Sequence, residues 1–307
     1  MAGIREISGR IRSVEDTRKI TNAMYMISST KLRKARKGME ANAPYFAYLQ
    51  RMLAAIMESI PDLESTYVDR REEKKGSERT KAILVITADK GLAGSYNHNV
   101  LKVVDKLLDC EEKVKLYVVG EVGRQYFAGK KVIMAGQFEY TAQNPSLHRA
   151  RVISEKLLDE FRNGETDEVY IVFTNLTDST TSEPQVRRLL PLIKEEVKER
   201  LEEDTGSAVL FREELQFVPN AQTVLENTVP DAMVGYVYSA LVDSYCSEQN
   251  DRMMAMDNAN RNADTMLRAL RISYNRERQA MITQEITEVA AGAKAQKKAK
   301  QEKQEDK

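Results

Sequence analysis

The C-terminal part of the chain, from about Pro230 to Gly292, constrains the fold more than any other feature. Between these two residues it contains no further proline and a single glycine, Gly235. The mean helix of a globular protein has only about 11–12 residues. A continuous helix over this stretch would be roughly 90 Å long, and it cannot be buried in one small core. It must therefore pack along another long element or extend out of a domain.

The apolar residues of this stretch recur at intervals of three and four. They form a narrow seam, which is typical of a coiled coil rather than of the broad apolar face of a globular helix. An ordinary long helix buried in a bundle is the alternative. The predicted seam consists of Met256, Ala259, Ala263, Met266 and Leu270, followed by Ile282, Ile286, Val289 and Ala293.

The N-terminal region mirrors this pattern and predicts a second long helix. The helix covers residues 4 to about 43 and can resume after Pro44 through Ile60. Two long helices at opposite ends of one chain each need a partner, and antiparallel packing on each other is the simplest solution. The predicted seam residues are Ile4, Ile7, Ile11 and Val14, then Ile20, Met24 and Ile27, then Leu32, Ala35 and Met39.

The middle of the chain has the pattern of an α/β domain. Apolar runs typical of buried strands alternate with helical patterns, which indicates a mainly parallel sheet. Strands are expected at Ala82–Thr87, Leu116–Gly120 and Val169–Thr174, with a weaker one at Lys131–Ala135, an antiparallel return at Val186–Leu190 and an edge strand at Ala208–Phe217. Helices are expected at Tyr96–Leu108, Val122–Phe127 and Ser146–Phe161.

These elements give a fold class and a division of the chain. The fold is predicted as an antiparallel coiled coil of terminal helices with an inserted, Rossmann-like α/β domain. The expected parts are an N-terminal coiled-coil helix (1–60), a charged linker (61–80), the α/β domain (81–217), a C-terminal coiled-coil helix (218–292) and a disordered charged tail (293–307). The tail lacks the apolar residues needed for packing.

The composition argues against a membrane-spanning protein and against a disulfide-rich one. The chain has 307 residues, 42% of them hydrophobic and 31% charged, with a net charge of zero. No run of eighteen apolar residues is present, so a spanning helix is not expected. Cys110 and Cys246 are the only cysteines, which favours a reducing compartment without a disulfide framework.

The loop Ala88–Asn97 is the one candidate for chemistry. It follows a predicted strand and opens a helix, where backbone N–H groups can hold an anion. However, Gly91 and Gly94 fit neither spacing of the common phosphate-binding motifs, and a tight turn is the alternative interpretation. His98 and His148 lie fifty residues apart with no accompanying ligand pattern. No catalytic residue, metal site or cofactor is therefore expected.

A dense basic cluster lies on the predicted N-terminal helix, from Lys31 to Lys37. A nucleic acid, an acidic protein surface and a solvated helix face are the possible interpretations. No aromatic residue interleaves the cluster, which argues against single-stranded nucleic acid.

Four segments carry a resemblance to a known family. Thr17–Ala35 (TRKITNAMYMISSTKLRKA), Thr87–Asn97 (TADKGLAGSYN), Glu248–Asp264 (EQNDRMMAMDNANRNAD) and Asn275–Ala291 (NRERQAMITQEITEVAA) are similar to the gamma subunit of F-type ATP synthases. They cover both termini and the centre in the family's order. The charged segment 62–80 and the long tail after Gly292 depart from the family pattern.

The resemblance implies a function as a rotor. The coiled coil would enter a hexagon of alternating alpha and beta subunits, and the α/β domain would lie near the epsilon subunit and the membrane c-ring. The chain itself would catalyse nothing, but its rotation would couple ion flow through the c-ring to ATP synthesis or hydrolysis. It would be a peripheral protein on the cytoplasmic face of the cell membrane, with no nucleic acid partner and no small-molecule substrate of its own.

The resemblance also implies which residues contact partner subunits. They are Met24, the basic residues Lys31, Arg33, Lys34 and Arg36, and the polar residues Arg278, Gln279, Thr283 and Gln284. The run Asn275–Gln279 is poor seam material, so Arg278 and Gln279 should face outward and be exposed in the isolated chain. A non-rotary coiled-coil scaffold with an α/β binding module and an enzyme that uses the Gly91–Gly94 loop are the competing hypotheses.

Overall fold

The computed structural model of the chain describes residues 2–59, 65–68, 79–110, 113–130, 132–138, 142–176, 181–205 and 216–305. Two compact units make up the chain. The coiled-coil unit contains Met1–Met26 and Met256–Lys307, and the sheet unit contains Ile27–Ala255. Two long helices, α1 (Ala2–Ser59) and α6 (Ala221–Glu305), contribute residues to both units.

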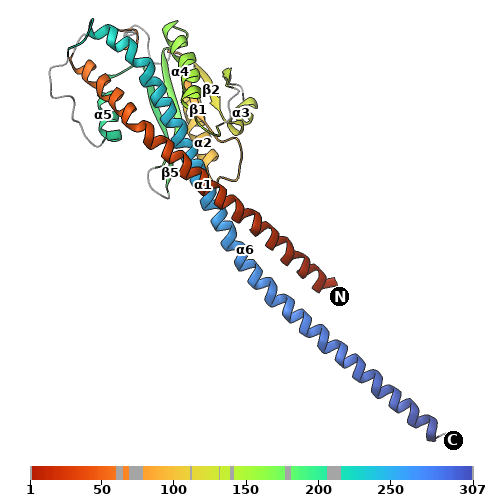
Figure 1. The fold of residues 1–307 in the computed structure, drawn as a ribbon. Helices are drawn as coiled ribbons and strands as arrows, with labels where there is room; N and C mark the ends of the chain where they lie inside the picture. Colours follow the sequence, from red (N-terminus) through yellow and green to blue (C-terminus); the bar gives the residue numbers. More distant parts are fainter. Residues whose placement is uncertain are drawn as a thin grey trace. The chain divides into compact units, whose positions relative to one another are not determined.

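The sheet unit is built on a five-stranded sheet with the order β3-β2-β1-β4-β5. Figure 1 labels three of these strands, β1, β2 and β5. Four strands are parallel, and β5 is antiparallel to β4. The strands are β1 (Lys81–Ile86), β2 (Val114–Val119), β3 (Ile133–Gln137), β4 (Glu168–Leu176) and β5 (Ser182–Leu190). This topology confirms the predicted α/β fold class and its antiparallel return.

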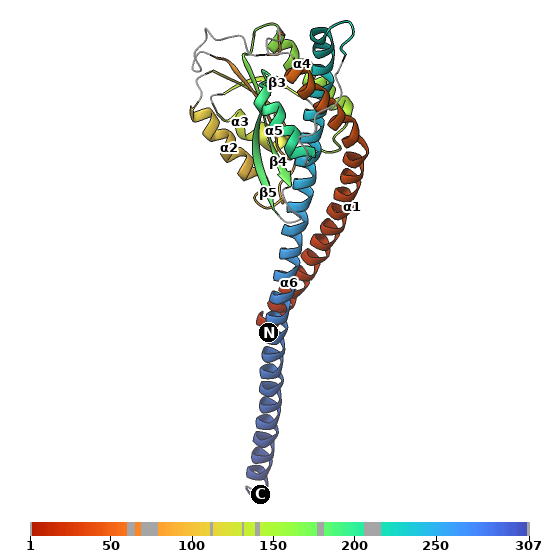
Figure 2. The same cartoon turned by 90° about the vertical axis from the view of Figure 1, so that its left-hand side faces the viewer.

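Both faces of the sheet are covered by helices, as Figure 2 shows. On one face, Ile83, Val85 and Val118 pack with side chains of α2 (Tyr96–Cys110) and α3 (Glu121–Ala128). On the other face, alternate residues of the same strands pack with α4 (Leu147–Arg162) and with the sheet-unit parts of α1 and α6. Because a parallel strand buried on both faces needs apolar residues throughout, its sequence is a continuous apolar run.

The coiled-coil unit confirms antiparallel packing of the two terminal helices. Glu15 pairs with Arg271 at 2.8 Å, and Arg18 pairs with Asp264 at 3.1 Å. The Thr21 hydroxyl donates to the Asn260 side-chain oxygen at 2.5 Å. Residue numbers rise along α1 while those of its partners fall along α6, so the N-terminal helix packs on the second half of α6.

Several predicted seam residues are wrong by one position. Ile20, Ile27 and Met266 are exposed by 62%, 55% and 53%. Their neighbours Thr21, Ser28 and Leu267 point inward instead, since Thr21 is half-buried and the other two are buried. With spacings of three and four, two neighbouring positions can both fit the seam pattern. Which of them faces inward depends on the residues of the partner helix.

The end of α6 differs from the prediction in two ways. Ile282, Ile286 and Val289 were expected in the seam, but they are exposed by 43%, 63% and 73%. Ile286 and Val289 lie beyond the start of α1 at Ala2, to judge from the pairing of Glu15 with Arg271. The expected disordered tail 293–307 is wrong as well, since α6 continues to Glu305. The tail is rich in Ala, Lys, Gln and Glu, which are strong helix formers.

Pro44 and Pro230 both lie inside helices. The N-terminal helix is therefore one element through Ser59, and α6 begins at Ala221, close to the expected start of the C-terminal helix at residue 218. Helix α5 (Lys194–Thr205) was not predicted. Residues 208–215 of the expected edge strand Ala208–Phe217 lie outside the described residues. The expected bounds of the other four parts of the chain stay predictions.

Part of the predicted linker 61–80 is firmly packed. Tyr67 is only 1% exposed. Its carbonyl accepts a 2.7 Å hydrogen bond from the Leu192 amide, and its hydroxyl accepts one of 2.7 Å from Arg162 Nε. The described residues of this segment are 65–68 and 79–80, and Tyr67 anchors the first of these stretches to the sheet unit.

Candidate functional site

The basic cluster of α1 lies on the outer face of the helix. Arg33, Lys34 and Arg36 are exposed, and Lys31 is half-buried. Leu32 lies between them and is buried in the core of the sheet unit. No hydrogen bond or ion pair within the described part of the chain engages Arg33, Lys34 or Arg36, so their charges are open to solvent. Met24, in the coiled-coil unit, is half-buried.

The polar residues predicted near the end of α6 are all exposed, as expected for the isolated chain. Arg278 and Gln279 lie in an exposed stretch before the half-buried Met281, and Thr283 and Gln284 lie in another one after it. Thr283 Oγ1 donates to the Gln279 carbonyl at 2.9 Å, and Gln284 donates to the Glu288 carboxylate at 2.9 Å. These bonds stay within α6, so the side chains are not used for packing against α1.

The loop Ala88–Asn97 connects β1 to α2 and is held by α6. Leu92 and Gly94 have positive φ angles of 63° and 54°, and Leu92 is exposed by 67%. Arg252 of α6 donates to the carbonyl oxygens of Lys90 and Gly91 at 3.3 and 3.1 Å. Positive φ is uncommon for a leucine, and these bonds help to maintain it.

Asp89 places a negative charge at the carboxyl edge of the sheet. Its carboxylate accepts hydrogen bonds from the backbone amides of Glu121 at 3.2 Å and Gln143 at 3.3 Å. In parallel α/β sheets this edge is where phosphates commonly bind to backbone N–H groups. Here a carboxylate takes up those donors and would repel a phosphate, which favours the turn interpretation of the loop.

Polar contacts fasten α6 to the same edge of the sheet. Within α6, Arg252 pairs with Glu248 at 2.6 Å, with only 11% and 5% of the two side chains exposed. Burial raises the pKa of Glu248, although Arg252 opposes this effect. Ser182 donates to Asp251 at 2.7 Å, and the Thr174 amide donates to Ser244 Oγ at 3.1 Å. The sequence did not predict these roles, although Glu248–Asp264 was among the segments that resemble the family.

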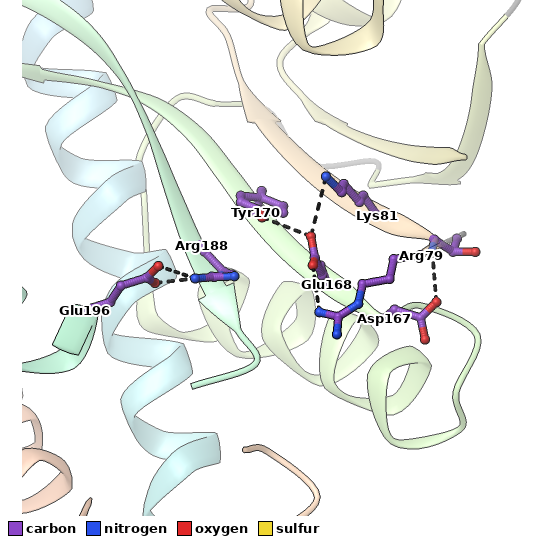
Figure 3. Close-up of polar contacts among 8 residues, drawn as sticks. Arg79, Lys81, Asp167, Glu168, Tyr170, Arg188 and Glu196 are labelled. Carbon is purple, nitrogen blue, oxygen red and sulfur yellow. Dashed lines mark hydrogen bonds and ion pairs between the residues drawn. The ribbon is translucent and has the colours of Figure 1, made fainter. Parts of the chain in front are cut away.

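A second polar network ties the segment before β1 to β4 (Figure 3). Glu168 accepts from Arg79 at 3.1 Å and from the Tyr170 hydroxyl at 3.0 Å, and it lies 3.6 Å from Lys81 Nζ. Only 8% of the Glu168 side chain is exposed. The Thr80 amide donates to Asp167 at 2.9 Å. This network fixes the sheet rather than forming an open site.

The described residues offer little for catalysis or metal binding. No group of three or more His, Cys, Asp or Glu among them is arranged to hold a metal ion. A cavity of about 380 Å³ in the sheet unit is lined largely by apolar side chains, including Met39, Phe46 and Phe173. None of the helices in the described part of the chain combines the length and the apolar character needed to cross a bilayer.

Comparisons with known proteins agree with this arrangement. The family model described as ATP synthase matches residues 3–296. The ATP synthase gamma chain of Ruminiclostridium cellulolyticum is 41% identical over 95% of this chain and 98% of its own length. That of Acetivibrio thermocellus is 41% identical over 97% of this chain and 100% of its own. A chain from the cryo-EM structure of the Euglena gracilis mitochondrial ATP synthase (OSCP/F1/c-ring) shares the fold, with a TM-score of 0.65, 19% identity and coverage of 96% of this chain and 94% of its own. The chain therefore belongs to the ATP synthase gamma chain family.

Proposed function

We propose that this chain is the central-stalk rotor of an F-type ATP synthase. Its rotation couples ion flow through a membrane c-ring to ATP synthesis or hydrolysis at the catalytic beta subunits. The observation that carries this proposal is the end of α6. Beyond the pairing with α1, this helix continues with Ile286 and Val289 exposed by 63% and 73%. An exposed helix end with apolar side chains fits a partner that surrounds it.

The energetics of the helices suit a shaft. Seam residues hold the two helices together, at about 1.5–3 kcal/mol for each well-buried apolar side chain. Exposed ion pairs contribute only about 0.2–1 kcal/mol each. Contacts of that strength between the basic cluster and acidic loops of the beta subunits would allow the shaft to move from one beta subunit to the next.

The asymmetry of the helix pair couples its rotation to the conformation of each beta subunit. Each beta subunit in the ring would meet a different face of the helix pair, and each face would favour a different conformation of that subunit. Differential binding of this kind shifts the nucleotide affinity of each subunit. The chain itself is non-catalytic in this proposal, and the Asp89 carboxylate at the edge of the sheet supports that role.

The proposal extends to the other partners and to location. The sheet unit contacts the epsilon subunit and the c-ring, and the chain is peripheral on the cytoplasmic face of the cell membrane. Within the ring of alpha and beta subunits, Arg278 and Gln279 form hydrogen bonds to beta-subunit groups, and Thr283 and Gln284 contact beta-subunit loops. Met24 and the basic cluster form further contacts to the same ring. The exposure of the α6 residues supports this assignment.

Reconstitution tests the proposal. Alpha and beta subunits are assembled with and without this chain, and ATP hydrolysis is measured for each mixture. A marked gain in ATPase activity with the chain is expected, together with its recovery in the complex. Failure to bind alpha and beta subunits would leave the non-rotary scaffold as the better hypothesis. ATP turnover by the isolated chain would instead support the enzyme hypothesis.

Replacing both Arg278 and Gln279 with alanine tests the contacts at the end of α6. The double variant should slow ATP hydrolysis in the assembled ring without changing the unfolding of the isolated chain, because both side chains are exposed there. Normal turnover and assembly would contradict this contact assignment but not the rotor itself.

A further inference from the structure

The end of α6 has no packing partner within the described part of the chain. Every residue from Ile282 to Gln296 is exposed, and Figure 2 shows α6 continuing past the N-terminus of α1. Most of the stability of a protein helix comes from tertiary packing, because an isolated helix of a few turns is marginal in water. This segment therefore depends on its own residues to remain helical.

The residues between Ile282 and Gly292 are poor helix formers. Nearly half of them are branched at Cβ, and such side chains lose rotational freedom in a helix. Gly292 adds a further cost, because a glycine gives up more backbone freedom than any other residue. The β-branched residues are Ile282, Thr283, Ile286, Thr287 and Val289.

The threonines and the following residues do not offset this weakness. Thr283 Oγ1 donates to the Gln279 carbonyl at 2.9 Å, and Thr287 Oγ1 donates to the Thr283 carbonyl at 2.8 Å. Bonds of this kind slightly destabilise a helix. The residues after Gly292 are better helix formers, but a helix shorter than about 12–15 residues is marginal without packing. They cannot hold the segment closed by themselves.

The preceding part of α6 tolerates the same kind of residue because it is packed. Met256, Ala263 and Leu267 are buried in the coiled-coil unit. Thr265 between them is exposed and donates to the Arg261 carbonyl at 3.1 Å, as the threonines near the end of the helix do. Opening α6 here would also expose its buried apolar side chains. Packing, and not residue type, therefore distinguishes the two parts of this helix.

The helical form of the end of α6 creates an apolar face. Ile282, Ile286, Val289 and Ala293 follow one another at intervals of four, three and four, which places them on one side of a helix. The face is lost when the helix opens. A partner that covers it therefore binds the helical form and stabilises that form by mass action.

We propose that Ile282–Gln296 is a marginal helix, which opens readily in the isolated chain and is held closed only when the ring of alpha and beta subunits covers it. Opening is a property of the isolated chain. Closure on the ring rests on the proposed function. Because ordering a segment on binding costs conformational entropy, this contact is weakened, which assists release from one beta subunit as the rotor turns toward the next.

Amide hydrogen exchange of the isolated full chain measures the opening. Amides from Thr283 to Gln296 should exchange within about tenfold of the rate of an unfolded peptide of the same sequence, because local opening there costs little free energy. Amides around Leu267 should exchange at least about a hundred-fold more slowly. Equal protection of the two parts of α6 would overturn the proposal.

A double variant tests whether helix propensity limits the segment. Thr287→Ala with Gly292→Ala changes no packing, since Thr287 is exposed and a Cβ at Gly292 meets nothing within 4 Å. It should slow exchange from Thr283 to Gln296 by about tenfold at an unchanged unfolding midpoint of the chain. The matched control, Thr265→Ala, should change exchange around Leu267 by no more than about twofold. A double variant that slowed exchange no more than the control would contradict the marginal helix.

The complex with alpha and beta subunits tests the closure. Amides from Thr283 to Gln296 should exchange at least about a hundred-fold more slowly in a complex that hydrolyses ATP than in the isolated chain. Unchanged fast exchange in such a complex would overturn the closure, while the proposed function would survive. A chain that formed no complex would contradict the proposed function and the closure together, and the isolated chain would still decide whether the helix is marginal.

Discussion

At the scale of single residues, Gly235 shows how closely α1 and α6 approach in the sheet unit. A Cβ atom added at Gly235 would lie 2.3 Å from Phe46 Cδ1 and 2.8 Å from Cε1. The Phe46 ring is itself buried and packs on Tyr238, with ring centroids 5.9 Å apart. The ring therefore has little room to move away.

Gly235→Ala should consequently lower the free energy of unfolding by about 1–3 kcal/mol, as overpacked cores do. Gly9→Ala is the matched control, because a Cβ there meets nothing within 4 Å, and it should raise stability by about 0.5–1 kcal/mol. Urea denaturation measures both. Equal effects of the two substitutions would contradict the close approach at Gly235.

Glu160 makes stability depend on pH. Burial alone would raise the pKa of this carboxyl, but hydrogen bonds from Tyr117, Lys156 and Lys115 outweigh burial and hold the pKa below its usual range. A carboxyl with a lowered pKa in the folded state stabilises the fold above the unfolded value of about 4.3. That stabilisation is lost as pH falls through the lowered folded value.

Glu160→Gln should therefore be less stable than the parent chain at neutral pH, and the difference should shrink as pH falls below about 4. Urea denaturation between pH 7 and pH 3 measures it. A difference that is constant over this range would mean that the Glu160 charge contributes nothing to stability.

At the scale of elements, α6 from Ile282 to Gln296 lies outside the packing of the isolated chain. Ile286 and Val289 are largely exposed, and the residues around them are exposed as well. Truncation at about Ile286 should leave the unfolding free energy of the chain within about 0.5 kcal/mol of the parent, since exposed surface changes have effects of that size. Thermal unfolding followed by circular dichroism measures it.

The same truncation should retain some torque in the assembled ring, because the seam between α1 and the preceding part of α6 remains. A large drop in the stability of the isolated chain would show that the end of α6 packs on the chain, contrary to its observed exposure.

The sequence predicted the kinds of elements better than their faces. Apolar runs such as Ala82–Thr87 were recognisable as strands because parallel strands are buried on both sides. The inward position of Thr21 beside the exposed Ile20 was not predictable, because it depends on the partner residue Asn260, far away in the chain. Helix α5 (Lys194–Thr205) is highly charged and has a weak apolar pattern, so little in its sequence marked it.

The exposure of some candidate contact residues could be predicted on physical grounds. The polar run Asn275–Gln279 cannot contribute to an apolar seam, and its exposure follows from that. The anchoring by Arg252 was not predictable, since its acceptors are backbone carbonyls of the loop at Lys90 and Gly91. Backbone acceptors leave no pattern in the sequence.

At the scale of the whole molecule, the basic cluster should act on partners and not on the fold. Replacing Lys31, Arg33, Lys34 and Arg36 with alanine should lower the ATPase activity of the reconstituted complex. Three of these side chains are exposed and Lys31 is half-buried, and exposed charges orient partners more than they stabilise a fold. The chain should unfold at nearly the same urea concentration as the parent.

The matched control replaces exposed basic residues elsewhere in the sheet unit, namely Lys102, Lys106, Arg151 and Lys198. It removes the same charge and should leave the ATPase activity of the complex with alpha and beta subunits unchanged. If both sets of replacements behaved like the parent, the cluster would be a solvated helix face.

Direct observation of rotation tests the central claim. Alpha and beta subunits are assembled with this chain and fixed to a surface, and a visible probe is attached to a cysteine placed at the exposed Lys106 of the sheet unit. On addition of ATP, the probe should turn in one direction and pause once for each catalytic beta subunit in the ring. ATP hydrolysis at the full rate while the probe remains static would contradict the rotor.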